Sequence, residues 1–537
     1  MRLDKKDILH IVVIIIGMIF VAIPVFHNNL WFDESYSVAI ANHTFKEIWT
    51  IGANDVHPVL YYWMLHIINL IFGNQIICYR LFSYICAVIV GILGFTHIRK
   101  DFGKNVGILF SFFSFFLPTI VVYTAEIRMY TFAMLLVTVM SIYAYRIYKN
   151  QGNKQIKNWI IFTICSLASA YTHYYGLMAA GIVNLIMFIY FVTKAVKDKK
   201  ITYEIKIFII CGILQIALYL PWIISLLGQM KQMSSTHFWI YLKFPDTIIE
   251  FLTFQFTGNL EKTKYTSDTY AILFSIVILG YLVYTCVRNM KNEEKENIAV
   301  KLSIVVYIGV ILGACAMSVV LNTPIIYARY MLCVTGLVIF VMSYAIAKKG
   351  NKYITMIICV LCIITGIFIT SNLCKDNYDE TNQKPFEYLR ENVKEGDILV
   401  CSNEGSGFVV SANFPDNFLY FYDESFWNVE EAYKAFGKHM KTIYNLEDLQ
   451  NVEGRIWVLD ADSYGLLEKI QNKYEINVID KRKYSTKYHG FQYSFALIEK
   501  WNGGIIKKWE YTRLLDHQEQ VKVIVHKWLQ EKTIYHI

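Results

Sequence analysis

Two adjacent carboxylates, Asp33 and Glu34, follow the first long apolar segment of the chain directly. That segment, Ile8 to Phe26, is long enough to cross a bilayer, so the acid pair is placed at the membrane–water boundary. A carboxylate is costly at that depth unless it is solvated, paired or used. One interpretation makes Asp33 a general base that takes a proton from a hydroxyl, with Glu34 supporting it. The alternative makes Asp33 the N-cap of a short helix that begins at Glu34.

A second polar group is Asp55-Val56-His57-Pro58. Asp55 and His57 either complete a polar pocket with Asp33 or precede a helix that begins at Pro58. Clusters of Asp and His can hold a divalent metal, but no fixed ligand spacing is present here. The metal question therefore stays open at this stage.

Two arginines, Arg128 and Arg329, are the informative cations, and each lies close to a tyrosine, Tyr130 and Tyr330. A lone arginine at the end of a membrane helix commonly extends to the lipid headgroups. Two of them on a face with few charges favour a phosphate clamp, because guanidinium binds phosphate oxygens in a bidentate geometry. Glu126 is a candidate to hold Arg128 in place.

His173 lies among several tyrosines in the segment Tyr171 to Tyr175. It belongs either to an aromatic belt at the membrane interface or to the same site as the arginines.

The elements that must position these residues are membrane helices. The chain has 537 residues, of which 55% are hydrophobic and 18% charged, and the apolar residues form segments of membrane-spanning length. The first is too long for a signal peptide and lacks a cleavage pattern. The pattern predicts about eleven transmembrane helices, near 8–26, 77–97, 105–123, 130–147, 158–174, 177–193, 206–226, 269–287, 301–321, 330–347 and 353–371.

The basic residues between these helices indicate the topology. Alternate gaps carry 22 lysines and arginines, whereas the intervening gaps carry 8. The positive-inside rule places the first set, and the N-terminus, in the cytoplasm. The net charge of +8 is thus a topology signal and not a sign of nucleic-acid binding. All of the polar groups above fall in the outer gaps.

Two domains are expected. Residues 1–371 form the membrane domain, whose first outer loop, 27–76, contains interfacial helices at Glu34–Ala41 and Pro58–Phe72. A second outer loop, 228–268, begins with a polar stretch suited to a lid. Residues 372–537 have the composition of a soluble α/β domain outside the membrane. Its expected strands are 397–401, 455–460, 474–480 and 491–499, and its expected helices are 385–395 and 430–439.

Read in order, these motifs resemble the GT-C membrane glycosyltransferases over roughly residues 8–345, within the protein O-mannosyltransferase, aminoarabinose transferase and RgtA/B/C/D-like group. The residues that carry the resemblance are Phe32-Asp33-Glu34, His57-Pro58-Val59-Leu60-Tyr61-Tyr62, Arg80, Ala125-Glu126-Ile127-Arg128-Met129-Tyr130, Thr172-His173-Tyr174 and Ala328-Arg329-Tyr330. The group often has a second proline after His57-Pro58, which this chain lacks.

The resemblance implies a hexosyltransferase that uses a polyprenyl-phosphate sugar as donor. It implies that Asp33 is the catalytic base with Glu34 as its neighbour. It further implies that the donor phosphate and sugar are bound by His57, Arg128, Tyr130, His173, Arg329 and Tyr330, supported by Asp55 and Glu126.

The expected function is transfer of the sugar with inversion to a hydroxyl of a cell-envelope glycopolymer, lipid or protein. The expected partners are this donor, membrane lipids and the acceptor, and the expected location is the cell membrane with the C-terminal domain outside. Three alternatives remain: a polymerase or ligase of lipid-linked polysaccharide, which needs a diphosphate donor; a transporter or flippase; and a membrane scaffold.

Overall fold

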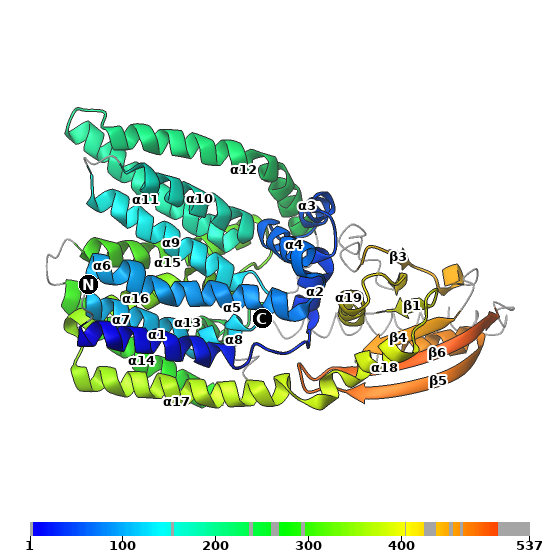
Figure 1. The fold of residues 1–537 in the computed structure, drawn as a ribbon. Coiled ribbons are helices and arrows are strands. Elements are labelled where there is room, and N and C mark those ends of the chain that lie inside the picture. The colour runs from blue at the N-terminus through cyan, green and yellow to red at the C-terminus, as the bar shows by residue number, and fades with distance from the viewer. Residues whose placement is uncertain are drawn as a thin grey trace, which may run out of the picture.

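The computed structural model contains a helical bundle and a β-sheet domain joined at one end of the bundle (Figure 1). It describes residues 4–151, 155–235, 240–258, 268–290, 296–402, 404–423, 437–449, 455–461 and 465–502. The helices of the bundle run side by side, and the sheet lies beyond their ends.

Each of the eleven predicted spans overlaps a helix or a closely spaced helix pair. In chain order these helices are α1 (Lys5–Ala22), α5 (Ile76–Leu93) continued by η1 (Gly94–Ile98) and α6 (Arg99–Phe102), α7 (Lys104–Phe116) with α8 (Pro118–Thr124), α9 (Tyr130–Lys149), α10 (Ile156–Thr172), α11 (Tyr174–Lys197), α12 (Tyr203–Ser235), α14 (Asp268–Met290), α15 (Asn297–Val320), η2 (Ala328–Met331) with α16 (Leu332–Lys349), and α17 (Lys352–Asn377).

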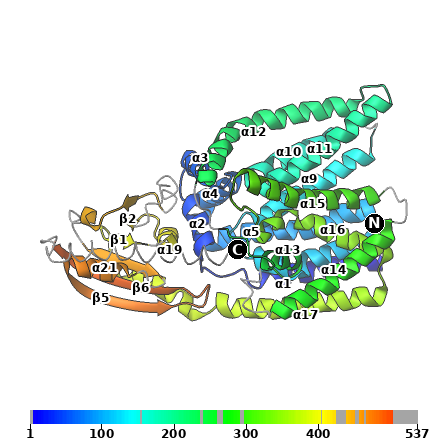
Figure 2. The ribbon, with the colours of Figure 1, turned by 180° about the vertical axis from the view of Figure 1, so that it is seen from behind.

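Eight helices among the described residues are long and apolar enough to cross a membrane, or nine if α7 and α8 form one span. The prediction of about eleven also counted α1 and α10. The first turn of α1 carries Lys5, Lys6 and Asp7, and α10 has only 17 residues. Both nevertheless lie within the bundle beside the longer helices (Figures 1 and 2).

The break between α7 and α8 bends the chain by 56°. Its cause is Pro118 at the start of α8, because proline has no N–H to continue the ladder and pushes the preceding residue out of the helical region. Leu117 is accordingly extended, with ψ 127°. The bend sets the direction of α8, which leads into the turn 125–129 that carries Arg128.

Three short helices lie across one end of the bundle, between it and the sheet domain (Figure 1). They are α2 (Phe32–Ala41), α3 (Phe45–Asn54) and α4 (Leu60–Phe72). The sequence predicted α2 and α4 but not α3, which begins at an N-cap formed by Thr44 and Glu47.

The second outer loop differs from its prediction. Residues 228–235, predicted as the polar start of this loop and suited to a lid, form the last two turns of α12, and α13 (Asp246–Thr257) follows within the loop. Gln229 of α12 donates a hydrogen bond to the carbonyl of Gly52 at 2.6 Å, so this end of α12 is attached to α3.

The C-terminal domain is a six-stranded mixed sheet in the order β3-β2-β1-β4-β6-β5, with the first four strands parallel and the last two antiparallel to their neighbours. The four predicted strands correspond to β1 (Ile398–Cys401), β4 (Ile456–Ala461), β5 (Glu475–Ser485) and β6 (Gln492–Asn502). The sequence did not predict β2 (Leu419–Tyr422), β3 (Met440–Ile443), α19 (Glu404–Asn413) or α21 (Leu466–Lys473).

The predicted helix 385–395 corresponds to α18 (Lys384–Asn392), whereas most of the predicted helix 430–439 lies outside the described residues. Helix α17 continues past the proposed domain boundary at residue 371 to Asn377, and the sheet domain packs back on the bundle through α19 and α2.

Close packing between α7 and the end of α5 depends on two glycines. A Cβ on Gly107 would lie 2.6 Å from the carbonyl oxygen of Gly94 and 2.6 Å from Cβ of Arg99. Small residues allow membrane helices to approach in this way. By contrast, a Cβ on Gly181 in α11 would meet nothing within 4 Å.

We therefore expect Gly107→Ala to lower the free energy of unfolding of the purified protein by about 1–3 kcal/mol, because the backbones of α7 and the end of α5 must move apart. The matched change Gly181→Ala should leave stability unchanged or raise it slightly, since alanine favours a helix. Thermal unfolding in detergent would give the melting temperatures of both variants. Equal melting temperatures for Gly107→Ala and Gly181→Ala would contradict the packing argument.

Candidate active site

Glu34, in the first turn of α2, has polar partners at both of its carboxylate oxygens. Its carboxylate and the guanidinium of Arg80 are both completely buried and pair twice, at 2.6 Å (Nη1 to Oε1) and 3.3 Å (Nη2 to Oε2). The backbone N–H of Ile127 donates to Oε1 at 3.0 Å, and the hydroxyl of Tyr488 donates to Oε2 at 2.8 Å. Glu34 is thus a fixed structural anion rather than a group open to a substrate.

Arg80 extends this network to two further backbone segments. Its guanidinium donates to the carbonyl of Asn29 at 2.7 Å and also to the carbonyl of Ala125. The pair therefore fixes three segments, namely the chain before α2, the start of α5 and the turn between α8 and α9. That turn includes Arg128.

Asp33 points to different partners from its neighbour. Its Oδ2 lies 2.9 Å from Nη1 of Arg329 and 4.0 Å from Nε of Arg128. Arg128 also donates to the backbone carbonyl of Asp33 at 3.0 Å and to the hydroxyl of Ser37 at 3.2 Å. A carboxylate and two guanidiniums from three distant segments thus meet in one cluster.

Two of the simpler alternatives are wrong. Asp33 does not cap the helix, because α2 begins at Phe32 and its N-cap residue is Trp31. The arginines do not extend to lipid headgroups, because the side chains of Arg128 and Arg329 are only 4% and 7% exposed. Glu126 is buried in the turn beside Arg128, and its role as a support for Arg128 stays a prediction.

Asp55 and His57 form a second polar group next to α2. Nδ1 of His57 lies 2.9 Å from Oδ2 of Asp55, and the hydroxyl of Tyr36 donates to the same oxygen. Burial alone would raise the pKa of Asp55, but the charge of His57 and the hydrogen bonds from His57 and Tyr36 hold it below its ordinary value. Helix α4 begins at Leu60, so Pro58 is not its first residue.

Aromatic side chains cover the arginine cluster. The guanidinium of Arg329 lies 4.8 Å from the ring centre of Tyr327 and 6.0 Å from those of Tyr130 and Tyr330. The ring of His173 is 5.8 Å from that of Tyr130 and 5.0 Å from that of Tyr330. The buried hydroxyl of Tyr130 has no hydrogen-bond partner among the described residues.

His173 is buried and is not a member of an interfacial belt. Its Nδ1 accepts a hydrogen bond from the backbone N–H of Tyr175 at 3.1 Å and so caps α11. Because Nδ1 is an acceptor, the ring is neutral. Burial, followed by the positive charges of His57, Arg128 and Arg329, lowers its pKa to about 3.

The structure therefore brings together the predicted residues Asp33, Arg128, Tyr130, His173, Arg329 and Tyr330, with Asp55 and His57 joined to α2 through Tyr36. Sequence reasoning missed the partnership of Arg80 with Glu34 and the contribution of Tyr488. Among the described residues, no three His, Cys, Asp or Glu side chains are placed to hold a metal ion.

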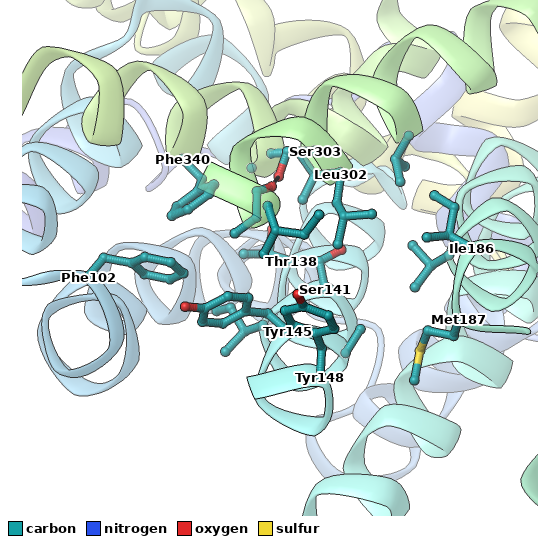
Figure 3. A pocket seen from close by; sticks show the side chains of 18 of the residues that line it. Phe102, Thr138, Ser141, Tyr145, Tyr148, Ile186, Met187, Leu302, Ser303 and Phe340 are labelled. Atoms are coloured by element: carbon teal, nitrogen blue, oxygen red, sulfur yellow. Dashed lines mark hydrogen bonds between the residues drawn. The ribbon is translucent and has the colours of Figure 1, made fainter. Parts of the chain in front are cut away.

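A cavity with an apolar lining lies elsewhere in the bundle, between α9, α11, α15 and α16 (Figure 3). Its volume is about 120 Å³, and its wall includes Phe102, Tyr145, Met187 and Phe340. It contains no charged side chain and shares no residue with the arginine cluster. Its lining suits hydrocarbon and not a phosphate, so the charged chemistry belongs to the cluster around Asp33.

Comparison with known proteins gives a family match to part of the chain and a similar fold for most of it. Residues 56–225 match the family model described as dolichyl-phosphate-mannose-protein mannosyltransferase. The fold is similar to that of ArnT from Cupriavidus metallidurans in the apo state, with a TM-score of 0.61 and 7% identity over 90% of this chain and 97% of that chain.

The same protein bound to undecaprenyl phosphate gives a TM-score of 0.59 and 8% identity, covering 91% and 97% of the two chains. At the level of sequence, no curated protein matches the chain.

The Glu34–Arg80 pair leads to a prediction about stability. Glu34→Gln leaves a completely buried guanidinium without its counter-charge, which costs about 3–5 kcal/mol. The control is Glu47→Gln in α3, since Glu47 also occupies the third position of a short helix but its side chain is 54% exposed and its pairing is worth at most about 1 kcal/mol. In thermal unfolding, Glu34→Gln should have a clearly lower melting temperature than Glu47→Gln. Equal melting temperatures would contradict the anchoring role of Glu34.

His173 leads to a prediction about pH. Its folded-state pKa of about 3 lies below the ordinary 6.5, so its contribution to stability is complete above pH 6.5 and is lost as the pH falls toward 3. At pH 5 the loss is about 2 kcal/mol. The melting temperature of the wild type should therefore fall more between pH 7 and pH 5 than that of His173→Asn. Parallel curves for the two proteins would exclude a buried neutral His173.

Proposed function

We propose that the chain is a membrane glycosyltransferase similar to the dolichyl-phosphate-mannose-protein mannosyltransferases, and that it transfers a sugar from a polyprenyl phosphate to an acceptor hydroxyl with inversion. The acceptor is a cell-envelope glycopolymer, lipid or protein. The observation that carries this proposal is the carboxylate of Asp33 placed against the guanidiniums of Arg128 and Arg329.

The arginine pair suits the phosphate of such a donor. Guanidinium groups form strong, directional bonds with phosphate oxygens, and this pair is buried, where water weakens such bonds least. The hydroxyl of Tyr130, beside the ring of Tyr330, is available to a phosphate or sugar oxygen. The ArnT structure with bound undecaprenyl phosphate supports a donor of the same class.

In the structure the carboxylate of Asp33 lies against both arginines. In the proposed reaction the donor phosphate takes over these two cations, and the carboxylate of Asp33 is released toward the acceptor. Asp33 then accepts the hydroxyl proton while the acceptor oxygen bonds to the anomeric carbon of the sugar. The bond between that carbon and the phosphate oxygen breaks, and polyprenyl phosphate leaves with its added negative charge against Arg128 and Arg329.

Attack from the face opposite the leaving phosphate inverts the anomeric centre, as in single-displacement glycoside chemistry. Glu34 does not react in this scheme. It holds the first turn of α2 and the turn that carries Arg128, so that Asp33 and the arginine keep their relative positions.

The proposed orientation places the site outside the cytoplasm. Helix α6 (Arg99–Phe102), which begins with two basic residues, lies at the end of the bundle opposite α2 and the sheet domain (Figure 1). The N-terminus is then cytoplasmic, while the site and the C-terminal domain face the cell envelope.

The test compares Asp33→Asn with the wild type, using purified protein in proteoliposomes and a panel of labelled polyprenyl-phosphate sugars. Loss of a general base lowers kcat by about 10²- to 10⁴-fold. Binding of the donor phosphate should be retained or become tighter, because asparagine no longer competes for the two arginines. The control is Asp101→Asn, which removes another Asp–Arg pair, with Arg146 at 2.7 Å, at the opposite end of the bundle.

Unchanged turnover by Asp33→Asn would exclude Asp33 as the base. Full activity with nucleotide sugars alone, or with polyprenyl diphosphate donors alone, would exclude the proposed donor class.

A further inference from the structure

The tip of the β5–β6 hairpin in the C-terminal domain reaches the membrane domain at Glu34. Its turn is closed by a hydrogen bond from the N–H of Thr486 to the carbonyl of Phe491 at 2.9 Å. Tyr488 in this turn is buried, and its hydroxyl donates to Oε2 of Glu34 at 2.8 Å. Residues 454 positions apart in the chain thus share one hydrogen bond at the centre of the carboxylate–arginine network.

The hairpin tip is held against this point by several independent contacts. The backbone N–H groups of Lys487 and Tyr488 both donate to Oδ1 of Asn382, at 2.8 and 2.9 Å. The ring of Tyr488 packs on His27 at 4.9 Å, and His489 stacks on Trp31 at 4.6 Å with an interplanar angle of 9°. The tip therefore contacts both the chain before α2 and Glu34 itself.

The backbone of the tip is also unusual. His489 has a φ of +53°, a backbone conformation that residues other than glycine rarely adopt and that costs about 1–2 kcal/mol. The stacking of its ring on Trp31 offsets this cost. Strain kept in place by contacts with a site is a common feature of functional loops.

We propose that Tyr488 is a positioning residue for the transfer reaction. Its hydroxyl fixes Glu34, and Glu34 in turn fixes Asp33 through α2 and Arg128 through the 125–129 turn. Of the two oxygens of Glu34, Oε1 has short bonds to Arg80 and Ile127, whereas the other contacts of Oε2, to Arg80 and the N–H of Trp31, are longer, at 3.3 and 3.5 Å. The Tyr488 bond is thus the shortest contact of Oε2.

Tyr488 can act as a donor over the whole physiological range. Burial, followed by the neighbouring charge of Glu34, raises the pKa of its hydroxyl well above the ordinary value. The role of Tyr488 in catalysis rests on the proposed function, but its role in holding the 125–129 turn does not, and the two can be measured separately.

The test compares Tyr488→Phe with Tyr484→Phe in the full chain. Tyr484 lies on β5 of the same hairpin and packs on Phe495 and Tyr388 of the sheet domain. Loss of one hydrogen bond to a buried charge should lower kcat in Tyr488→Phe by about 10-fold or more, with the donor KM within about 2-fold of the wild type. Hydrogen exchange in peptides covering residues 125–131 should become faster, because the Ile127 N–H depends on Glu34. Tyr484→Phe should change neither measurement.

A second variant, Asn382→Ala, frees the hairpin tip without altering Tyr488 and should produce the same two effects to a smaller extent. Wild-type kcat and wild-type exchange in Tyr488→Phe would overturn the proposal, as would an increase in KM alone. If the wild-type protein transfers no sugar from any polyprenyl phosphate, the proposed function fails. In that case hydrogen exchange in residues 125–131 still tests whether Tyr488 holds the 125–129 turn. Unchanged exchange in Tyr488→Phe would overturn its positioning role.

Discussion

The buried ion pair of Glu34 and Arg80 is the constraint on which the site depends. Removing two charges from water costs several kcal/mol for each ion, and only good geometry with further hydrogen bonds offsets this cost. Here the further bonds come from backbone groups of Ile127, Asn29 and Ala125 and from the hydroxyl of Tyr488. Ile127 and Ala125 share the 125–129 turn, Asn29 and Glu34 belong to the start of α2 and the chain before it, Arg80 lies in α5, and Tyr488 lies in the β5–β6 hairpin. One ion pair therefore fixes the relative positions of four parts of the chain.

Because Asp33 and Glu34 are adjacent in a helix, their carboxylates can lie in different surroundings. Successive side chains on a helix point about 100° apart, so one carboxylate can be fixed in the protein while its neighbour faces a different environment. Glu34 faces Arg80 and is completely buried, whereas Asp33 faces the two other arginines. Because Glu34 and Asp33 are neighbours in one turn of α2, fixing Glu34 also restricts the position of Asp33, the candidate base.

The sequence predicted this site unevenly. Hydrophobic segments and the distribution of lysine located the bundle and placed Asp33, Arg128 and Arg329 on one side, because membrane insertion depends on local composition. The pairing of Glu34 with Arg80 and Tyr488 left no such signal, because it joins residues 46 and 454 positions apart. The strands β2 and β3 were also missed. They are as short as β1, but β1 is a nearly continuous buried segment, whereas β2 and β3 are partly exposed and their place in the sheet depends on parallel partners elsewhere in the chain.

The charges in the cluster also suit the proposed reaction. Asp33 carries one negative charge and Arg128 and Arg329 carry two positive charges, so these three groups together have one excess positive charge. A polyprenyl-phosphate sugar carries one negative charge at its phosphodiester and makes the cluster neutral. When the sugar is transferred, the leaving phosphate gains a second negative charge while Asp33 becomes neutral by accepting the proton. In the proposed reaction the summed charge of Asp33, the two arginines and the phosphate therefore stays at zero, so that this group of charges does not change its net charge in a low-dielectric site.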